Sequence, residues 1–313
     1  MCSQAFAAYD FFLKKIACNI GFAQGVSAVI KGSAVCTRPM NLTDVLEVVR
    51  LTDVGRKREH NEDAVASDME IGLVVLADGM GGYKAGEVAS EIAVLTIVAE
   101  LKESMLALQP GQTDMAEGMQ AENRLIYDAV AKANASVYSV SQSQPQCAGM
   151  GTTLVMGLFT NDKLLVGHIG DSRMYRLRGE ELVQMTEDHS LLQEQIKSGL
   201  MTPAQAKLSA NKNLVTRALG IDPEVELELH EYEVEAGDIY LLCSDGLSDL
   251  VEDEDIHLTL TTLSANLGLA ANQLIQMAND NGGKDNISVI LARVLKSYSV
   301  ERSWYDKLFN WLK

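Results

Sequence analysis

The sequence predicts an α+β protein whose strands form antiparallel sheets. Short apolar runs follow one another through tight turns, as in residues 152–177, where turns at 160–162 and 170–171 separate three strand-like runs. Helical periodicity is confined to two long excursions, 87–137 and 253–279. A doubly wound parallel sheet would require strands and helices to alternate regularly, and this chain does not do so.

The elements follow from the apolar pattern. The run 71–77 is apolar and bounded by a glycine and an aspartate, as expected of a buried strand. Val225, Leu227 and Leu229 alternate with glutamates, which predicts a half-exposed strand. We predict strands over 47–54, 71–77, 152–159, 163–169, 174–177, 225–229, 239–243 and 287–294, and helices over 87–101, 119–137 and 253–279.

Residues 190–216 stand apart from this pattern. They contain two short helical pieces, 191–198 and 203–207, and a polar stretch of small residues, 209–213. Two interpretations are equally compatible with the sequence. The segment is either a mobile flap over a site or a surface subdomain.

The charge is unevenly distributed along the 313 residues, whose formal net charge is −17. Residues 1–40 carry +3 and residues 299–313 carry +1, so the acidity belongs to residues 41–298, which carry −21. This break predicts a domain over 41–298, an N-terminal extension over 1–40 and an amphipathic C-terminal tail over 299–313. The acidity argues against a nucleic-acid partner, because that class of protein binds phosphates through a surplus of basic side chains.

Both ends of the chain leave alternatives open. The extension contains an apolar stretch around residues 6–16, which would pack on the core. The tail places Trp304, Leu308 and Trp311 beside two lysines, so it would either pack on the core or touch a membrane surface or a partner.

Cysteine usage and hydropathy predict a reducing, cytoplasmic location. Five cysteines, an odd number without a CxxC pair, support neither a disulfide framework nor a thiolate zinc site. No stretch reaches the roughly 18 apolar residues of a transmembrane helix. Asp10 and the Lys14-Lys15 pair interrupt the pattern of a signal peptide. We therefore expect a cytoplasmic monomer.

Five aspartates lie at the ends of predicted strands: Asp63, Asp78, Asp171, Asp245 and Asp285. A single aspartate at such a position usually caps a turn. Five are harder to explain in this way, because carboxylates at buried strand ends must be paired, hydrogen-bonded or bound to metal. If they converge, their oxygens would select Mg²⁺ or Mn²⁺ over zinc.

Two neighbouring features fit a site that handles phosphate. Gly79 follows Asp78 and would let the backbone approach a ligand closely and offer its carbonyl. Arg58 lies just beyond the first strand, where its guanidinium would match two phosphate oxygens. The alternative for Arg58 is an exposed arginine within the basic run 56–58.

Other catalytic motifs are absent from the sequence. It contains no GxGxxG, no GxxxxGK[ST] and no GxSxG. The histidines show no metal-ligand spacing; His168 fits a core position in a strand, and His189, which precedes the segment 190–216, is the one histidine to watch.

Taken in order, eight segments resemble the metal-dependent serine/threonine protein phosphatases of type 2C, in their bacterial branch. The resemblance covers residues 45–295 and implies a four-layer α/β/β/α sandwich, in which helices flank two central antiparallel sheets. The matching segments are Arg58-x-x-Asn61-Glu62-Asp63, Ala77-Asp78-Gly79-Met80-Gly81-Gly82, Gly151-Thr152-Thr153, Gly170-Asp171-Ser172-Arg173, Asp188-His189-Ser190, Arg217-Ala218-Leu219-Gly220, Ser244-Asp245-Gly246-Leu247 and Gly283-Lys284-Asp285-Asn286-Ile287-Ser288.

The resemblance also implies a role for each residue. Asp78 would bridge two Mg²⁺ or Mn²⁺ ions, Arg58 would bind the substrate phosphate, and Asp171 with Asp245 would hold a third, weaker ion. The segment 190–216 would be the flap. The remaining roles are metal ligation by Asp63, the Gly79 carbonyl, Asp245 and Asp285, and support of these ligands by Glu62 and Asn286.

The implied activity is hydrolysis of phosphoserine and phosphothreonine on proteins, which reverses a Ser/Thr kinase. A water bridging the two metal ions would attack phosphorus directly. Met80 stands where eukaryotic relatives often have a histidine proposed as general acid, so the acid is unassigned. Two alternatives remain, a catalytically silent domain on this fold and a hydrolase of small phosphoesters or nucleotides.

Overall fold

The computed structural model describes residues 42–82, 84–107, 121–202, 205, 209 and 214–298. The predicted extension 1–40 and the predicted tail 299–313 lie outside the described residues. So does most of the predicted helical piece 203–207 and of the polar stretch 209–213. Within the described part of the chain, none of the helices combines the length and apolar character that a bilayer crossing requires.

The first sheet contains five strands, all antiparallel to their neighbours. Its order is β1 (Leu46–Asp53), β11 (Ile287–Val294), β10 (Ile239–Cys243), β7 (Arg173–Arg178) and β8 (Glu181–Gln184). β10 and β11 lie inside this sheet, and every side chain of the two strands except that of Arg293 is buried, which matches their apolar runs in the sequence.

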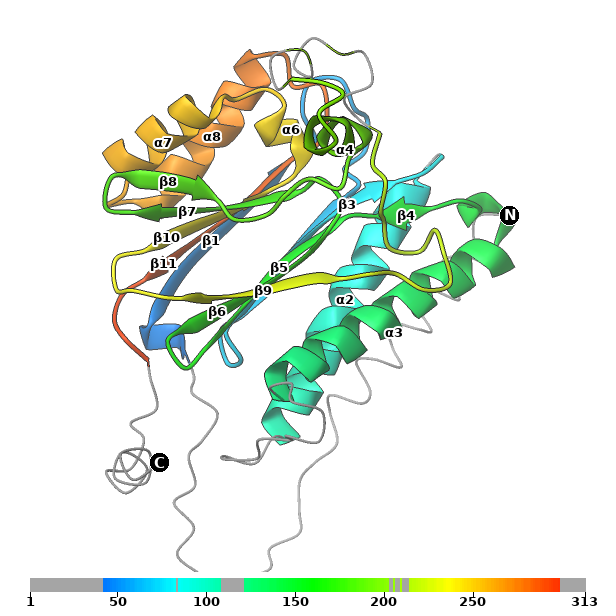
Figure 1. Cartoon of the computed structure of the whole chain (residues 1–313), viewed down its shortest axis with the longest axis horizontal. Helices are drawn as coiled ribbons and strands as arrows, with labels where there is room; N and C mark the ends of the chain where they lie inside the picture. Colours follow the sequence, from blue (N-terminus) through cyan, green and yellow to red (C-terminus); the bar gives the residue numbers. More distant parts are fainter. Residues whose placement is uncertain are drawn as a thin grey trace, which may run out of the picture. The chain divides into compact units, whose positions relative to one another are not determined.

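The second sheet faces the first (Figure 1). It is also antiparallel, with the order β2 (Asp63–Asp68), β3 (Leu73–Met80), β5 (Leu154–Thr160), β6 (Lys163–Ile169) and β9 (Glu228–Glu233). The short strand β4 (Gly151–Thr152) pairs with the end of β3. The chain crosses from β6 in this sheet to β7 in the other through residues 170–172.

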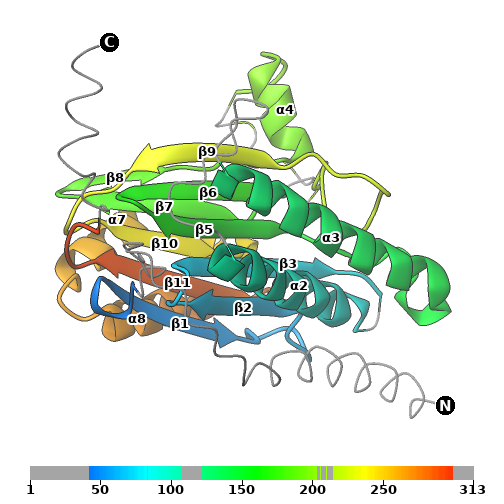
Figure 2. The ribbon, with the colours of Figure 1, turned by 90° about the horizontal axis from the view of Figure 1, so that it is seen from below.

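Helices cover the outer face of each sheet, as Figures 1 and 2 show. α2 (Ala85–Ala107) and α3 (Ala121–Ser143) pack on the second sheet, and α7 (Asp253–Thr262) and α8 (Leu267–Asp280) on the first. Three apolar cores result: one under each helix pair and one between the sheets. The remaining helices are the short α4 (Leu191–Lys197) and α6 (Asp245–Ser248), with 3₁₀ turns at Leu42–Asp44 and Pro145–Cys147.

The sequence-based prediction of the strands needs three corrections. The strands β2 and β8 were missed, because each contains a single β-branched residue and so gives little strand signal in the sequence. The strand predicted over 225–229 begins only at Glu228, and the run before it is irregular. Val225 and Leu227 nevertheless pack on the core under α2 and α3, so their alternation marks burial rather than strand pairing.

The single helix predicted over 253–279 is two helices. Asn266 breaks it, because its side chain accepts a hydrogen bond from the backbone N–H of Leu269 at 3.0 Å and so caps the start of α8. The predicted helix 87–101 is confirmed as the longer α2. The predicted helix 119–137 is confirmed from Ala121 onward, as α3, and its first two residues lie outside the described residues.

Candidate metal centre

The five predicted aspartates come together at one end of the sandwich. Asp63 begins β2 and Asp78 lies near the end of β3, in one sheet. In the other sheet, Asp245 follows β10 and Asp285 precedes β11, while Asp171 lies in the turn between the two sheets. After desolvation, all four of the other carboxylates contribute to raising the pKa of Asp78, which is consistent with their lying close to it.

Asp63 and Asp78 are direct partners across the strands β2 and β3. Opposite residues in an antiparallel pair hold their side chains on one face, roughly 5 Å apart at Cβ, where like charges are unfavourable. The Ser244 hydroxyl donates a hydrogen bond to Asp63 Oδ2 at 2.9 Å, which fixes one side of the carboxylate. The other oxygen, Oδ1, is buried and has no hydrogen-bond partner within the described part of the chain.

The backbone around Asp78 is held by two threonines. Thr153 donates its N–H to the Asp78 carbonyl at 2.8 Å, and its Oγ1 accepts the Asp78 N–H at 3.0 Å. The Thr152 hydroxyl donates to the same carbonyl at 2.8 Å. These contacts fix Asp78 against rotation, and sequence reasoning missed the role of both threonines.

Gly79 stands where no side chain fits. A Cβ at this position would lie 2.1 Å from the carbonyl oxygen of Gly86, at the start of α2, and 2.6 Å from that of Glu62. The Gly79 N–H donates to the Glu62 carbonyl at 3.0 Å. The glycine therefore lets the strand end, the helix start and the loop before β2 meet beside Asp78.

The electrostatics of the site favour a bound cation. Desolvation, followed by repulsion from Asp63 and the other carboxylates, raises the pKa of Asp78 well above its usual value. Desolvation and the neighbouring acids likewise raise the pKa of Asp245, and its Oδ1 is buried without a partner among the described residues. Desolvation, as the largest cause, also raises the pKa of Asp63 and of Asp171 to about 6.

These features fit divalent metal ions of the hard, oxygen-binding type. Orphaned carboxylate oxygens in a crowded acidic site are unfavourable unless a cation neutralises them. The donors are carboxylate and carbonyl oxygens, the set that suits Mg²⁺ and Mn²⁺. The residues present therefore fit the predicted ions.

Arg58 lies at the rim of this cluster. Its Nη2 donates to Asp285 Oδ2 at 2.6 Å, and its side chain is 47% exposed. Burial lowers the pKa of Arg58, but Asp285, Glu62 and Asp78 outweigh this and raise it. Arg58 is exposed, as the alternative interpretation expected, and its guanidinium nevertheless contacts Asp285, one of the clustered acids.

Asn286 ties together the segments that carry Arg58 and Asp63. Its side-chain amide donates to the carbonyls of Val54 and His60, both at 2.9 Å, and its Oδ1 accepts the N–H of Glu62 at 2.8 Å. The buried amide thereby holds the loop between β1 and β2 against the start of β11. Glu62 itself is partly buried, and desolvation raises its pKa.

Comparison with known proteins gives the family. The model of the family described as Protein phosphatase 2C matches residues 54–280. The chain belongs to the protein phosphatase 2C family. The family predicted from the eight segments is confirmed.

Curated relatives are bacterial phosphatases. The serine/threonine protein phosphatase PstP of Mycobacterium tuberculosis is 40% identical over 254 residues, which cover 81% of this chain and 46% of the relative. The chain thus spans about half the length of the first curated relatives it matches. The protein phosphatase PhpP of Streptococcus pneumoniae is 34% identical, and the match covers 79% of this chain and 96% of the relative.

Solved structures agree with the architecture. The PstP catalytic domain in complex with two manganese ions is 39% identical, covers 80% of this chain and 99% of its own, and has a TM-score of 0.68. The phosphatase from Streptococcus agalactiae is 32% identical, with coverages of 80% and 99% and a TM-score of 0.69. The predicted α+β fold with two antiparallel sheets between helical layers is confirmed.

Proposed function

We propose that this chain hydrolyses phosphoserine and phosphothreonine on proteins in a reaction that depends on Mg²⁺ or Mn²⁺. The observation that carries the proposal is the acidic cluster with its orphaned oxygens, set beside an arginine at the rim. Its family membership and its similarity to bacterial serine/threonine phosphatases support the substrate class.

The chain's own residues divide the work of metal binding. Asp63, Asp78, Asp245, Asp285 and the Gly79 carbonyl would hold two ions, as the two manganese ions of the related PstP domain support. Asp171, together with Asp245, would hold a third, weaker ion; Glu62 and Asn286 would keep the ligands in place. When bound, such ions supply positive charge that polarises the phosphoryl group and acidifies water.

Arg58 would bind the substrate phosphate. Its bond to Asp285 uses one of the five N–H donors of the guanidinium, and the planar group suits two phosphate oxygens. Asp78 and Asp63, fixed by Thr153 and Ser244, would keep the site's geometry unchanged through the reaction. Phosphoryl transfer requires little of the protein beyond such positioning and charge.

We further propose that residues 41–298 form the phosphatase domain, with 190–216 as its flap, 1–40 as an extension and 299–313 as a tail. In this proposal the chain acts as a cytoplasmic monomer and opposes a Ser/Thr kinase. The acidic domain disfavours a nucleic-acid partner. Gel filtration of the full chain would test the monomer. Phosphoproteins that accumulate in a strain lacking this chain, and no longer do so when a Ser/Thr kinase is also removed, would test the opposition to a kinase.

The deciding experiment compares substrates and metals. The full chain is assayed with matched phosphoserine, phosphothreonine and phosphotyrosine peptides, free phosphoserine and a nucleotide, with Mn²⁺, with Mg²⁺ and with a chelator. We expect metal-dependent turnover of the first two peptides. No turnover with any metal would favour a silent domain, and faster turnover of free phosphoserine or the nucleotide would favour a small-phosphoester hydrolase.

A further inference from the structure

The segment 187–190 is hydrogen-bonded to the turn that carries Asp171. Gly170, immediately before Asp171, uses both of its backbone polar groups on one residue: its carbonyl accepts the backbone N–H of His189 at 2.8 Å, and its N–H donates to His189 Nδ1 at 3.1 Å. His189 is only 7% exposed. One histidine therefore fixes the peptide groups next to the aspartate.

This contact determines the tautomer of His189. A backbone N–H can only donate, so Nδ1 is the acceptor and the neutral ring carries its proton on Nε2. Nε2 lies 3.1 Å from Glu228 Oε2, at the start of β9, and a carboxylate can only accept. Glu228 thus selects the tautomer that leaves Nδ1 free for Gly170. Arg217 Nη1 lies farther from Nε2, at 3.5 Å.

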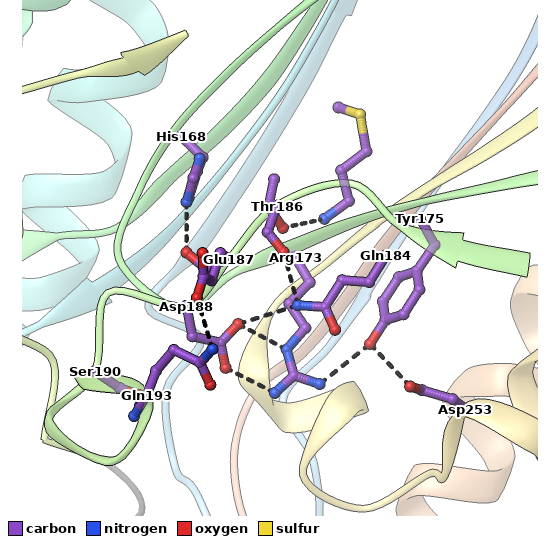
Figure 3. Close-up of polar contacts among 11 residues, drawn as sticks. His168, Arg173, Tyr175, Gln184, Thr186, Glu187, Asp188, Ser190, Gln193 and Asp253 are labelled. Carbon is purple, nitrogen blue, oxygen red and sulfur yellow. Dashed lines mark hydrogen bonds and ion pairs between the residues drawn. The ribbon is translucent and has the colours of Figure 1, made fainter. Parts of the chain in front are cut away.

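The two residues before His189 are also held (Figure 3). Arg173, two residues after Asp171, donates two hydrogen bonds to the Asp188 carboxylate, at 2.8 and 2.7 Å. The carbonyl of Glu187 lies 2.7 Å from Nε2 of the buried His168 and accepts its proton. The segment is thus anchored just before His189, which limits the freedom of its ring to leave Gly170.

The turn also contacts Thr153, the residue that is hydrogen-bonded to Asp78. Gly170 has φ +106°, and a Cβ there would lie 2.7 Å from Thr153 Cγ2, so the turn packs directly on the threonine that holds Asp78. Ser172 Oγ, on the other side of Asp171, forms a 2.7 Å hydrogen bond with Thr153 Oγ1. The position of Asp171 is therefore determined relative to Asp78 from both directions.

A metal ion bound by His168, His189 and Glu228 would be the competing interpretation, because their ligand atoms lie within 4.8 Å of one another. Two observations oppose it. Ligation through His189 Nε2 would move the proton to Nδ1, against the Gly170 N–H. The two imidazole rings are stacked, with centroids 4.4 Å apart and planes 22° apart, so their in-plane lone pairs run nearly parallel instead of converging.

We propose that His189, held in its Nε2–H tautomer by Glu228, is a positioning residue that places Asp171 for metal binding by accepting the Gly170 N–H. The inference rests on the proposed function in one respect, that Asp171 is a metal ligand. His189 touches neither substrate nor metal in this role; it acts through the turn 170–171.

Three substitutions at His189 distinguish the effect of its hydrogen bond with Gly170 from the effect of its packing. In His189→Asn, the amide oxygen falls where Nδ1 lies, so it can still accept the Gly170 N–H. In His189→Gln, the amide reaches the position of Nε2 and can meet Glu228, but nothing replaces Nδ1. His189→Ala removes both contacts. Asn and Gln are both polar and smaller than histidine, which makes them a matched pair.

Two readouts are independent of turnover. Hydrogen exchange of the Gly170 amide, measured by NMR on the metal-free chain, should be slow in wild type and His189→Asn and at least tenfold faster in His189→Gln and His189→Ala. Mn²⁺ binding, measured by electron paramagnetic resonance, should weaken about tenfold at the weakest site in the Gln and Ala variants, the loss typical when support of a metal ligand is removed. The Asn variant should stay within about threefold of wild type, because it keeps the acceptor.

The outcomes are distinguishable. The proposal is overturned if the Asn and Gln variants lose Mn²⁺ affinity equally, or if the Ala variant keeps wild-type affinity. Should all variants unfold, Glu228→Ala provides the second test, because it removes the acceptor that selects the Nε2–H tautomer and should increase Gly170 exchange; no increase would contradict the tautomer argument. If wild type binds Mn²⁺ but hydrolyses no phosphopeptide, the proposed function fails while the positioning role is still decided by these measurements.

Discussion

The strand β10 has an aspartate at each end, and the two have opposite surroundings. Asp238, just before the strand, is 1% exposed and accepts hydrogen bonds from Arg178 Nε and Nη2, from the N–H of Glu235 and from the Tyr240 hydroxyl. Asp245, just after the strand, has a buried oxygen for which the described residues offer no hydrogen-bond partner, and it faces other carboxylates. One end is complete without a ligand, and the other requires one.

The pKa values express the same difference. Burial alone would raise the pKa of Asp238, but hydrogen bonds from Arg178, Glu235 and Tyr240 lower it below its usual value. At the other end, desolvation and repulsion raise the pKa of Asp245. A carboxylate whose charge is already compensated is structural, whereas one whose charge is uncompensated marks a cation site.

The largest expected effect is on turnover. Asp78→Asn should reduce metal-dependent hydrolysis of a phosphopeptide about 10³-fold or more, since the loss of several kcal/mol of charge stabilisation corresponds to that factor. Asp128→Asn, at an exposed position on α3, is the matched control and should leave turnover unchanged. Unchanged turnover in Asp78→Asn would sink the assignment of the site.

The next effect contrasts the two ends of β10 in stability. Asp238→Asn should destabilise the metal-free chain by about 2–4 kcal/mol, because the bidentate partner of Arg178 is lost. Asp245→Asn should stabilise the metal-free chain by about 1–2 kcal/mol at pH 7.5, because it removes a repelled charge. Urea unfolding with a chelator present measures the unfolding free energy of both variants. If both substitutions change it in the same direction, the contrast between the two ends of β10 is wrong.

The pH dependence should follow the raised pKa values. Asp63 and Asp171, with pKa values of about 6 in the folded chain against about 3.9 for an unfolded aspartate, bind more protons when folded. Their contribution to stability is fully present below pH 4 and is lost as the pH rises through about 6. The difference in unfolding free energy between wild type and Asp171→Asn should therefore change between pH 5 and 7.5 in the chelated protein.

Above pH 6, saturating Mn²⁺ should remove most of the pH dependence of this difference in unfolding free energy. Below pH 6, Mn²⁺ should bind more weakly, because protons compete for the same oxygens. If the difference in unfolding free energy between wild type and Asp171→Asn did not depend on pH, Asp171 would not be desolvated in the way that the structure indicates.

The smallest expected effect concerns the hydroxyl that supports Asp63. Ser244→Ala removes the hydrogen bond to Asp63 Oδ2. It should weaken the binding free energy of Mn²⁺ by about 1 kcal/mol, which corresponds to roughly a fivefold rise in the Mn²⁺ concentration for half-maximal binding. Ser248→Ala on α6 is the control. A Ser244 variant that binds Mn²⁺ as tightly as wild type would mean that the ions alone hold Asp63.

The sequence was informative about the acids and less so about their partners. Asp78 and Asp245 stand out because each ends a buried apolar run, and the ends of neighbouring strands meet. The pairing of Arg58 with Asp285 joins residues 227 positions apart, and only the loop held by Asn286 brings them together. Nothing local distinguishes Asp238 from the site residues, since its partner Arg178 lies in another strand.

The role of His189 could not be read from the sequence for a related reason. Histidine spacing tests for shared metal ligation, and this histidine binds a backbone amide instead. Its function depends on which ring nitrogen carries the proton, and Glu228, 39 residues away, decides that. β2 was missed because its strand character comes from pairing with β3 rather than from its composition.

The passage of the chain from β6 to β7 beside Asp171 has a mechanical consequence. The acids come from both sheets, so ions held among them would join the two sheets at the end where repulsion otherwise pushes them apart. The apolar layer between the sheets holds the sandwich through its middle. At the site end, hydrogen bonds such as that from Ser244 to Asp63 also join the two sheets, and bound cations would add to them, so loss of the metal should loosen this end of the sandwich without separating the sheets.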